Sequence, residues 1–266
     1  MRRSRRHDAA VGQGRQDRHN ADRGEELQVT YLIVAATALA AGLVQGVTGF
    51  GSGIVQMFTY PMLWGVTSAA AVSACASVPL NVDMVLTYRR SIRRREVLAP
   101  VVPYLIVCSA AISLSRGADP RLIRKLFGLF LLLLSLYYLF VDHGGKVRMG
   151  AWKACAFIVV SALCDAFFGI GGPLMVLYYL NRTDSKEEYL GTIAAFFLIN
   201  GVWNTAFRIY AGILTAERAP HLLVAIAGIV AGVTVAHRVV GRLDGAALKK
   251  VIYVMIGFSG LANMLS

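Results

Sequence analysis

The residues best suited to chemistry lie around two glycine-rich breaks in otherwise apolar sequence. The first break runs from Gly46 to Gly53 (GVTGFGSG) and the second from Gly169 to Pro173 (GIGGP). Glycine adopts positive φ and lets other atoms approach the backbone closely. Inside a bilayer, such a break is tolerated only where protein or a water-filled cavity covers the freed backbone groups. Paired breaks in matching positions of two halves therefore indicate a transporter-like binding site.

Each break is followed by residues that can start a helix, and helix starts attract anions. The first N–H groups of a helix have no intrahelical partner and lie at the positive end of its dipole. Pro173 fits a first turn, where its missing N–H costs nothing. An alternative is that the glycines only allow close helix packing, since Gly42 with Gly46 and Gly49 with Gly53 have GxxxG spacing. We predict that the two helix starts face each other and bind a small anion, with these candidate substrate-binding residues: Thr48, Gly49, Gly51, Ser52, Gly53, Gly169, Gly171, Gly172 and Pro173.

Asp165 is the ionisable residue placed deepest in an apolar run. It lies four residues before Gly169, and its counterpart at the first break is Gln45. Ionisable groups at membrane depth are costly and indicate function by default. We predict that Asp165 carries a proton coupled to anion movement and that Gln45 binds substrate without titrating. The alternative is that Asp165 caps the turn or pairs with a cation.

Three polar residues share one face of a later helix. Asn200 and Asn204 are four residues apart and are followed, four residues on, by Arg208. Asn81 occupies the corresponding part of the first half. Amides and a guanidinium suit a small oxyanion, so we include all four among the candidate substrate-binding residues. Alternatively, the asparagines join membrane helices and Arg208 extends toward a membrane surface.

The elements that must position these residues are membrane helices. The chain of 266 residues is 56% hydrophobic and 16% charged, whereas soluble chains carry about 25% charged residues. Apolar runs of about 20 residues recur along almost its whole length, which predicts an integral helical membrane protein. Two series are predicted: a broken segment at about 31–64 with helices at 67–88, 97–115 and 121–141, then a broken segment at 151–180 with helices at 189–212, 219–236 and 246–265.

Several other classes of protein are disfavoured. The net charge of +12 arises from basic residues in short loops, where they set topology, so no nucleic-acid partner is predicted. Cysteines and histidines lack metal-ligand spacing, so neither a metal site nor a cofactor is predicted. No nucleophile–base set lies at membrane depth, so the protein is predicted not to be an enzyme.

The two series align at an offset of 120 residues, which matches Gly49 with Gly169 and Pro100 with Pro220. If each broken segment is a hairpin, the second half is inverted and fourteen Lys/Arg lie on the cytoplasmic side against six opposite. Single kinked crossings give ten on each side, so inversion fits the positive-inside rule better. The predicted division is a disordered basic and polar tail at 1–28, a first transmembrane repeat at 29–141 and a second at 142–266.

The doubled glycine motif resembles the TauE/SafE family of sulfite-exporter-like membrane permeases. The resemblance spans about residues 30–266 and is most specific at Gly49–Gly53 and Gly169–Pro173. It implies two inverted halves, each opening with a helix–turn–helix segment, and movement of sulfite, sulfonates or other small, often sulfur-containing anions. The sequence departs from the family pattern in Ser52 and Pro173, where glycine is common.

Together these features predict an all-α polytopic transmembrane bundle of two inverted repeats in a bacterial-type inner membrane. The predicted function is secondary transport of small anions by alternating access around the paired glycine turns. A channel-like passive anion pore and a non-transport membrane scaffold are the alternatives left open. The predicted partners are the small anion and the lipid bilayer, and small-residue helix faces would suit a homodimer.

Overall fold

The computed structural model describes the backbone of residues 2–115, 117–140 and 150–239. All regular structure in these ranges is helical, and six helices are long and apolar enough to cross a membrane. The predicted all-helical membrane architecture is therefore confirmed. The predicted helix at 246–265 lies outside the described residues.

The helices are α1 (Arg2–Thr48), α2 (Ser52–Trp64), α3 (Val66–Ala76), α4 (Val78–Tyr88), α5 (Arg94–Ser115), α6 (Pro120–Phe140), α7 (Ala151–Phe168), α8 (Gly172–Leu180), α9 (Lys186–Tyr210) and α10 (Ala219–Val239), with 3-10 turns η1 (Arg89–Ser91) and η2 (Ala216–Arg218).

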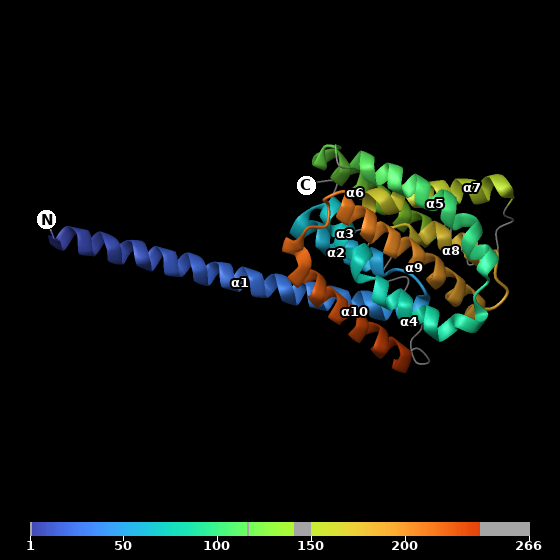
Figure 1. The fold of residues 1–266 in the computed structure, drawn as a ribbon, viewed down its shortest axis with the longest axis horizontal. Coiled ribbons are helices and arrows are strands. Elements are labelled where there is room, and N and C mark those ends of the chain that lie inside the picture. The colour runs from blue at the N-terminus through green and yellow to red at the C-terminus, as the bar shows by residue number, and fades with distance from the viewer. Residues whose placement is uncertain (1, 116, 141–149, 240–266) are drawn as a thin grey trace.

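The N-terminal segment, for which the sequence predicts a disordered tail, continues the first membrane helix in the structure, and the division into a tail and two repeats stays a prediction. α1 begins at Arg2 and extends far beyond the bundle (Figure 1). The segment contains no proline and is rich in residues that tolerate a helix, so it continues the register of the apolar part. Residues 24–29 are exposed, whereas Val34 and Ala38 are fully buried. Within residues 24–48, full burial therefore begins at Val34.

Both predicted breaks occur where the sequence places them. The chain interrupts its helices between α1 and α2 and again between α7 and α8. Gly49, Gly51 and Gly169 have φ values of 83°, 104° and 65°, which residues other than glycine rarely adopt. α2 then returns along α1, as shown by the hydrogen bond that the Tyr60 hydroxyl donates to the Val34 carbonyl at 3.4 Å. The first broken segment is thus a helical hairpin.

The second broken segment also folds back. α5 and α7 run side by side in one direction, because the Tyr104 hydroxyl lies 3.3 Å from the Ser161 carbonyl and the Cys108 sulfur, one turn on, lies 4.0 Å from Asp165 Oδ2. α8 brings the Tyr179 hydroxyl to the Glu96 carbonyl at 3.3 Å, near the start of α5. Since α8 starts beside the end of α7 and finishes level with its beginning, α7 and α8 also form a hairpin.

Small residues bring α1 and α10 together. Gly228 faces Ala38, while Gly46 faces Ala236 further along, so the two helices run parallel. A Cβ added at Gly42 would overlap the backbone of Ile229. The packing role considered for Gly42 and Gly46 therefore applies to these two glycines, which lie before the turn.

Helix contacts divide the bundle into two opposed directions (Figure 1). Gly191 near the start of α9 faces Tyr88 at the end of α4, and Gly201 faces Val78, so α9 is antiparallel to α4. The Trp203 indole N–H donates to the Ser109 hydroxyl at 2.8 Å, consistent with α5 and α9 running parallel. Thus α1, α3, α4 and α10 run one way, and α5, α7 and α9 run the other.

Candidate functional site

The two glycine breaks meet at a polar cavity of about 80 Å³. They approach so closely that a Cβ added at Gly53 would lie 2.7 Å from the Gly169 carbonyl oxygen. α2 and α8 both begin at the cavity wall, as predicted for facing helix starts. The lining comes from both breaks and from α1, α2, α3, α4, α7 and α9. It consists of Gln45, Gly51, Ser52, Gly53, Ile54, Ser73, Ala74, Ser77, Asn81, Asp165, Gly169, Ile170, Gly171, Gly172, Phe197, Asn200, Gly201 and Asn204.

On the first-half side, Gln45 organises an uncharged hydrogen-bond network. Its amide nitrogen donates to Asn81 Oδ1 at 2.9 Å. Its Oε1 accepts from the Ser52 backbone N–H at 3.2 Å and from the Ser52 hydroxyl. Asn81 in turn donates to the Ser77 carbonyl at 3.0 Å. Gln45 thus satisfies an N–H at the start of α2 that the helix itself leaves without a partner.

On the second-half side, Asp165 occupies the position equivalent to Gln45. It is 9% exposed, and its Oδ2 accepts from the Asn200 amide at 2.7 Å and the Asn204 amide at 3.0 Å. The thiol sulfur of Cys108 lies 3.6 Å from Asn204 Oδ1. Two amide donors on one oxygen stabilise a buried carboxylate. The structure therefore joins Asp165, Asn200 and Asn204 into one cluster on the cavity wall.

Arg208 lies behind this cluster, with 1% of its surface exposed. Its Nη2 donates to the carbonyl oxygens of Asp165 at 3.1 Å and Ala166 at 2.8 Å. These carbonyls belong to the last turn of α7, where a cation offsets the negative end of the helix dipole. Nε and Nη1 have no hydrogen-bond partner among the described residues. Because the side chain is buried, it does not extend to a membrane surface. Its substrate-binding role stays a prediction.

Three candidates at the breaks do not line the cavity. The Thr48 hydroxyl lies 2.9 Å from the Val44 carbonyl oxygen and 2.6 Å from the Phe50 carbonyl oxygen, so it can donate to either and closes the turn after α1. Gly49 packs against Leu190. Pro173 occupies the first turn of α8, as predicted, and lines a separate apolar cavity. These positions shape the breaks from outside, and a substrate contact for them stays a prediction.

Sequence reasoning missed Ser73 and Ser77, which line the cavity on the first-half side. Their signal was present, because Ser73, Ser77 and Asn81 are spaced by four residues like Asn200, Asn204 and Arg208. The helical face that lies across the cavity from Asn200 and Asn204 is therefore also polar. Among the described residues, no group of His, Cys, Asp and Glu side chains could hold a metal ion.

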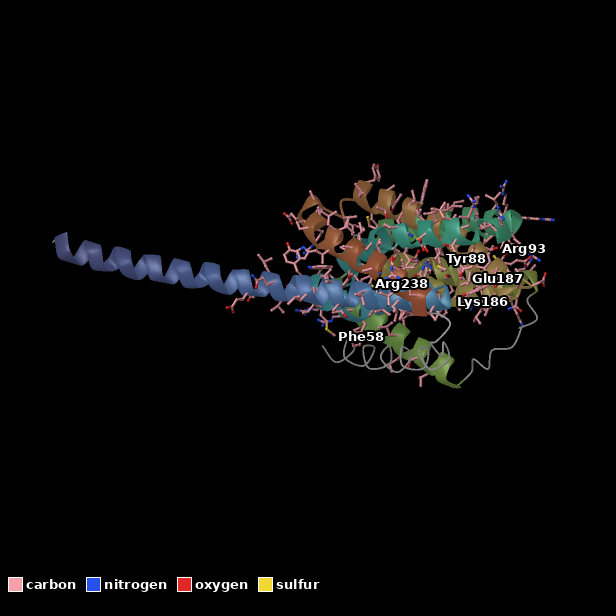
Figure 2. The ribbon with its side chains drawn as sticks, turned by 90° about the horizontal axis from the view of Figure 1, so that it is seen from below. Phe58, Tyr88, Arg93, Lys186, Glu187 and Arg238 are labelled. Atoms are coloured by element: carbon pink, nitrogen blue, oxygen red, sulfur yellow. The ribbon has the colours of Figure 1, made fainter. Side chains whose placement is uncertain are left out.

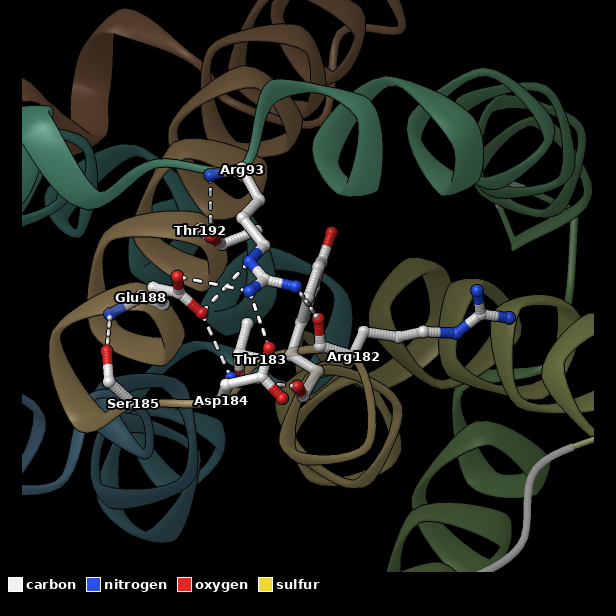
Figure 3. Close-up of polar contacts among 8 residues, drawn as sticks. Arg93, Arg182, Thr183, Asp184, Ser185, Glu188 and Thr192 are labelled. Carbon is white, nitrogen blue, oxygen red and sulfur yellow. Dashed lines mark hydrogen bonds and ion pairs between the residues drawn. The ribbon is translucent and has the colours of Figure 1, made fainter.

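The basic segment 89–96, which links α4 to α5, joins the two halves at one end of the bundle (Figures 2 and 3). The Arg93 Nη2 lies 2.6 Å from Asp184 Oδ2, and its Nε lies 2.9 Å from Glu188 Oε2. Nη1 donates to the Arg182 carbonyl at 3.3 Å, and the backbone N–H of Arg93 donates to the Thr192 hydroxyl at 3.1 Å. The hydrogen bonds to Glu188 and Asp184 raise the pKa of Arg93 above its usual value. We call these contacts the Arg93 cluster.

Comparison with known proteins gives one family match. The family described as "Sulfite exporter TauE/SafE" matches residues 34–263, which include both breaks and every lining residue of the cavity. The family resemblance read from the doubled glycine motif is thus confirmed. No curated protein matches the chain, and no solved structure does.

Proposed function

The chain belongs to the sulfite exporter TauE/SafE family, and we propose that it is a secondary transporter of small anions, sulfite and sulfonates among them. One observation carries the proposal: the two glycine breaks face each other across a buried polar cavity. A water molecule needs about 10–15 Å³ of free space, so about 80 Å³ suits several waters or one small ion. Paired broken helices at a central site are the arrangement that transporters use for substrate.

The cavity wall offers the chemistry that a small oxyanion requires. The starts of α2 and α8 supply the positive ends of two helix dipoles. Hydroxyl and amide groups of Ser73, Ser77, Asn81 and Asn200 supply neutral hydrogen-bond donors. Neutral donors and dipoles bind an anion without holding it too tightly to release.

Asp165 couples this site to protons in our proposal. It is the sole titratable side chain among the residues that line the cavity. The Asp165 carboxylate repels an incoming anion, whereas the protonated, neutral acid does not. Binding of a proton to Asp165 therefore favours binding of the anion in the cavity, and the two occupy the site together. Arg208, held at the backbone of Asp165, adds a buried positive charge nearby. We infer that this charge keeps the empty, deprotonated site close to neutral.

Two inverted repeats and alternating access complete the proposal. The helix directions support it, since α7 runs opposite to α1, α9 opposite to α3 and α4, and α10 opposite to α5. Each of these pairs matches under the offset of 120 residues. In such a transporter one end of the substrate path must be closed while the other is open. We assign the closed end to the Arg93 cluster, because its contacts join loop 89–96 of the first half to residues 182–192 of the second.

Uptake of labelled sulfite into proteoliposomes, with and without an imposed pH gradient, tests the proposal. Wild-type protein is expected to show saturable uptake that the gradient accelerates, and Asp165→Asn is expected to lose the acceleration. Asp83→Asn is the matched control, since Asp83 is a membrane-helix carboxylate that pairs with His237 outside the cavity. Acceleration that survives in Asp165→Asn would remove this residue from the coupling path. Absence of uptake for both sulfite and methanesulfonate would contradict the transport proposal.

A further inference from the structure

A further cavity, of about 380 Å³, lies at the end of the bundle opposite the Arg93 cluster, and its mixed lining includes two arginines. It forms where α2 ends and where α3 and α6 begin. α3 and α4 span the distance between the two ends, from Val66 at this cavity to Tyr88 beside the Arg93 cluster. None of its lining residues lines the central cavity. It is therefore a separate site.

The charged side chains of this cavity are all positive. Arg121 and Arg124, one helical turn apart on α6, both line it, and no carboxylate does. Neither guanidinium has an ion-pair partner within the described ranges. The neighbouring Asp119 is occupied in capping α6, since its Oδ1 accepts from the Arg121 backbone N–H at 2.9 Å. Two cations thus share one hollow, and no carboxylate of the described residues forms an ion pair with either of them.

The remaining wall also favours an anion. α3 begins here, after Gly65, without a side-chain cap, so its first N–H groups lack a capping oxygen. Thr67 and Ser68 in its first turn add two hydroxyl groups. Trp64 forms the apolar edge, and the guanidinium of Arg218 lies 5.4 Å over its ring. The hollow therefore combines unpaired guanidinium groups with further hydrogen-bond donors.

We propose that this cavity binds an oxyanion group, held by Arg121 and Arg124. Arginine forks match the paired oxygens of phosphate, sulfate and sulfite groups. Two sources share this chemistry: the phosphate of an anionic phospholipid headgroup and a free inorganic oxyanion. Binding here is independent of the proposed transport, so its test stands even where no flux occurs.

Trp64 provides a reporter inside the cavity. Replacing the other two tryptophans, in Trp152→Phe/Trp203→Phe, leaves it as the sole indole of the chain. The purified full-length protein in neutral detergent is titrated with sodium sulfite at constant ionic strength. Parallel titrations use dioctanoyl phosphatidylglycerol and, as the uncharged-headgroup comparison, dioctanoyl phosphatidylcholine. We expect a saturable change in Trp64 fluorescence with sulfite or phosphatidylglycerol and none with phosphatidylcholine.

The decisive comparison is between two pairs of arginine variants in that background. Arg121→Gln/Arg124→Gln is expected to raise the half-saturating concentration by about tenfold or more, as loss of charge-assisted hydrogen bonds requires. Arg94→Gln/Arg95→Gln removes the same charge from exposed positions at the other end and is expected to leave binding unchanged. Saturation by sulfite alone identifies a free-anion site, and saturation by phosphatidylglycerol alone identifies a lipid site. No saturable change, or one that persists without Arg121 and Arg124, would overturn the proposal.

Discussion

Gly53→Ala tests whether contact between the two breaks builds the site. A Cβ at Gly53 would lie 2.7 Å from the carbonyl oxygen of Gly169, and the next atom it meets is that same carbonyl carbon at 3.9 Å. Ordinary contact begins at 3.4 Å, so one break must move by about 0.7 Å. Because the obstacle is backbone, no side-chain rotation can relieve it.

The expected cost follows from this overlap. Extra methyl groups in tightly packed interiors destabilise by about 1–3 kcal/mol, and we expect about 2 kcal/mol for Gly53→Ala. Displacement of the breaks also changes the cavity that they enclose. Sulfite uptake per folded molecule is therefore expected to fall, in addition to the loss of stability.

Gly172→Ala provides the matched control for stability at the other break. Its Cβ would meet Phe197 at 3.7 Å and Phe50 at 3.9 Å, both ordinary contacts. Alanine is also preferred over glycine in a helix, so stability is expected to hold or rise slightly. Both variants are compared by unfolding in detergent and by uptake in proteoliposomes at equal amounts of folded protein. Wild-type stability and uptake in Gly53→Ala would refute the packing argument.

Two further predictions concern the cationic residues. Arg208→Ala is expected to lower the free energy of unfolding by about 3 kcal/mol, because the buried Asp165 carboxylate loses a nearby positive charge and two carbonyls of α7 lose their donor. Equal unfolding curves for variant and wild type would contradict this. Arg93→Gln is expected to increase hydrogen exchange in residues 182–188, since the Arg93 cluster joins the two halves there. Arg94→Gln, at an exposed position, is the control. Identical exchange in both variants would show that the Arg93 cluster does not close this end of the bundle.

Sequence alone predicted the parts of the site that depend on local backbone and helical spacing. Glycine is needed where φ is positive, so the breaks were visible as runs that include Gly49 and Gly169. The four-residue spacing of Asn200 and Asn204 predicts that they share one helix face, and both amides donate to the same carboxylate oxygen of Asp165.

Pairings across the two halves could not be predicted in the same way. Arg93 and Asp184 are 91 residues apart, and their contact depends on how α5 and α9 pack. Arg208 has the sequence setting of a helix-end cation, but tertiary packing places it against the carbonyls that end α7. The polarity of the N-terminal segment suggests disorder, while nothing in its sequence stops a helix, and in the structure α1 starts at Arg2.

Counterflow of sulfite tests the central claim most directly. Proteoliposomes are loaded with unlabelled sulfite, diluted, and given a trace of labelled sulfite outside. An alternating-access site between the two glycine breaks predicts a transient accumulation of label above equilibrium. Unlabelled sulfite inside competes with the label for the inward-facing site, so label enters faster than it leaves. Label that enters only to equilibrium, at a rate unaffected by internal sulfite, would contradict a carrier and favour a passive pore.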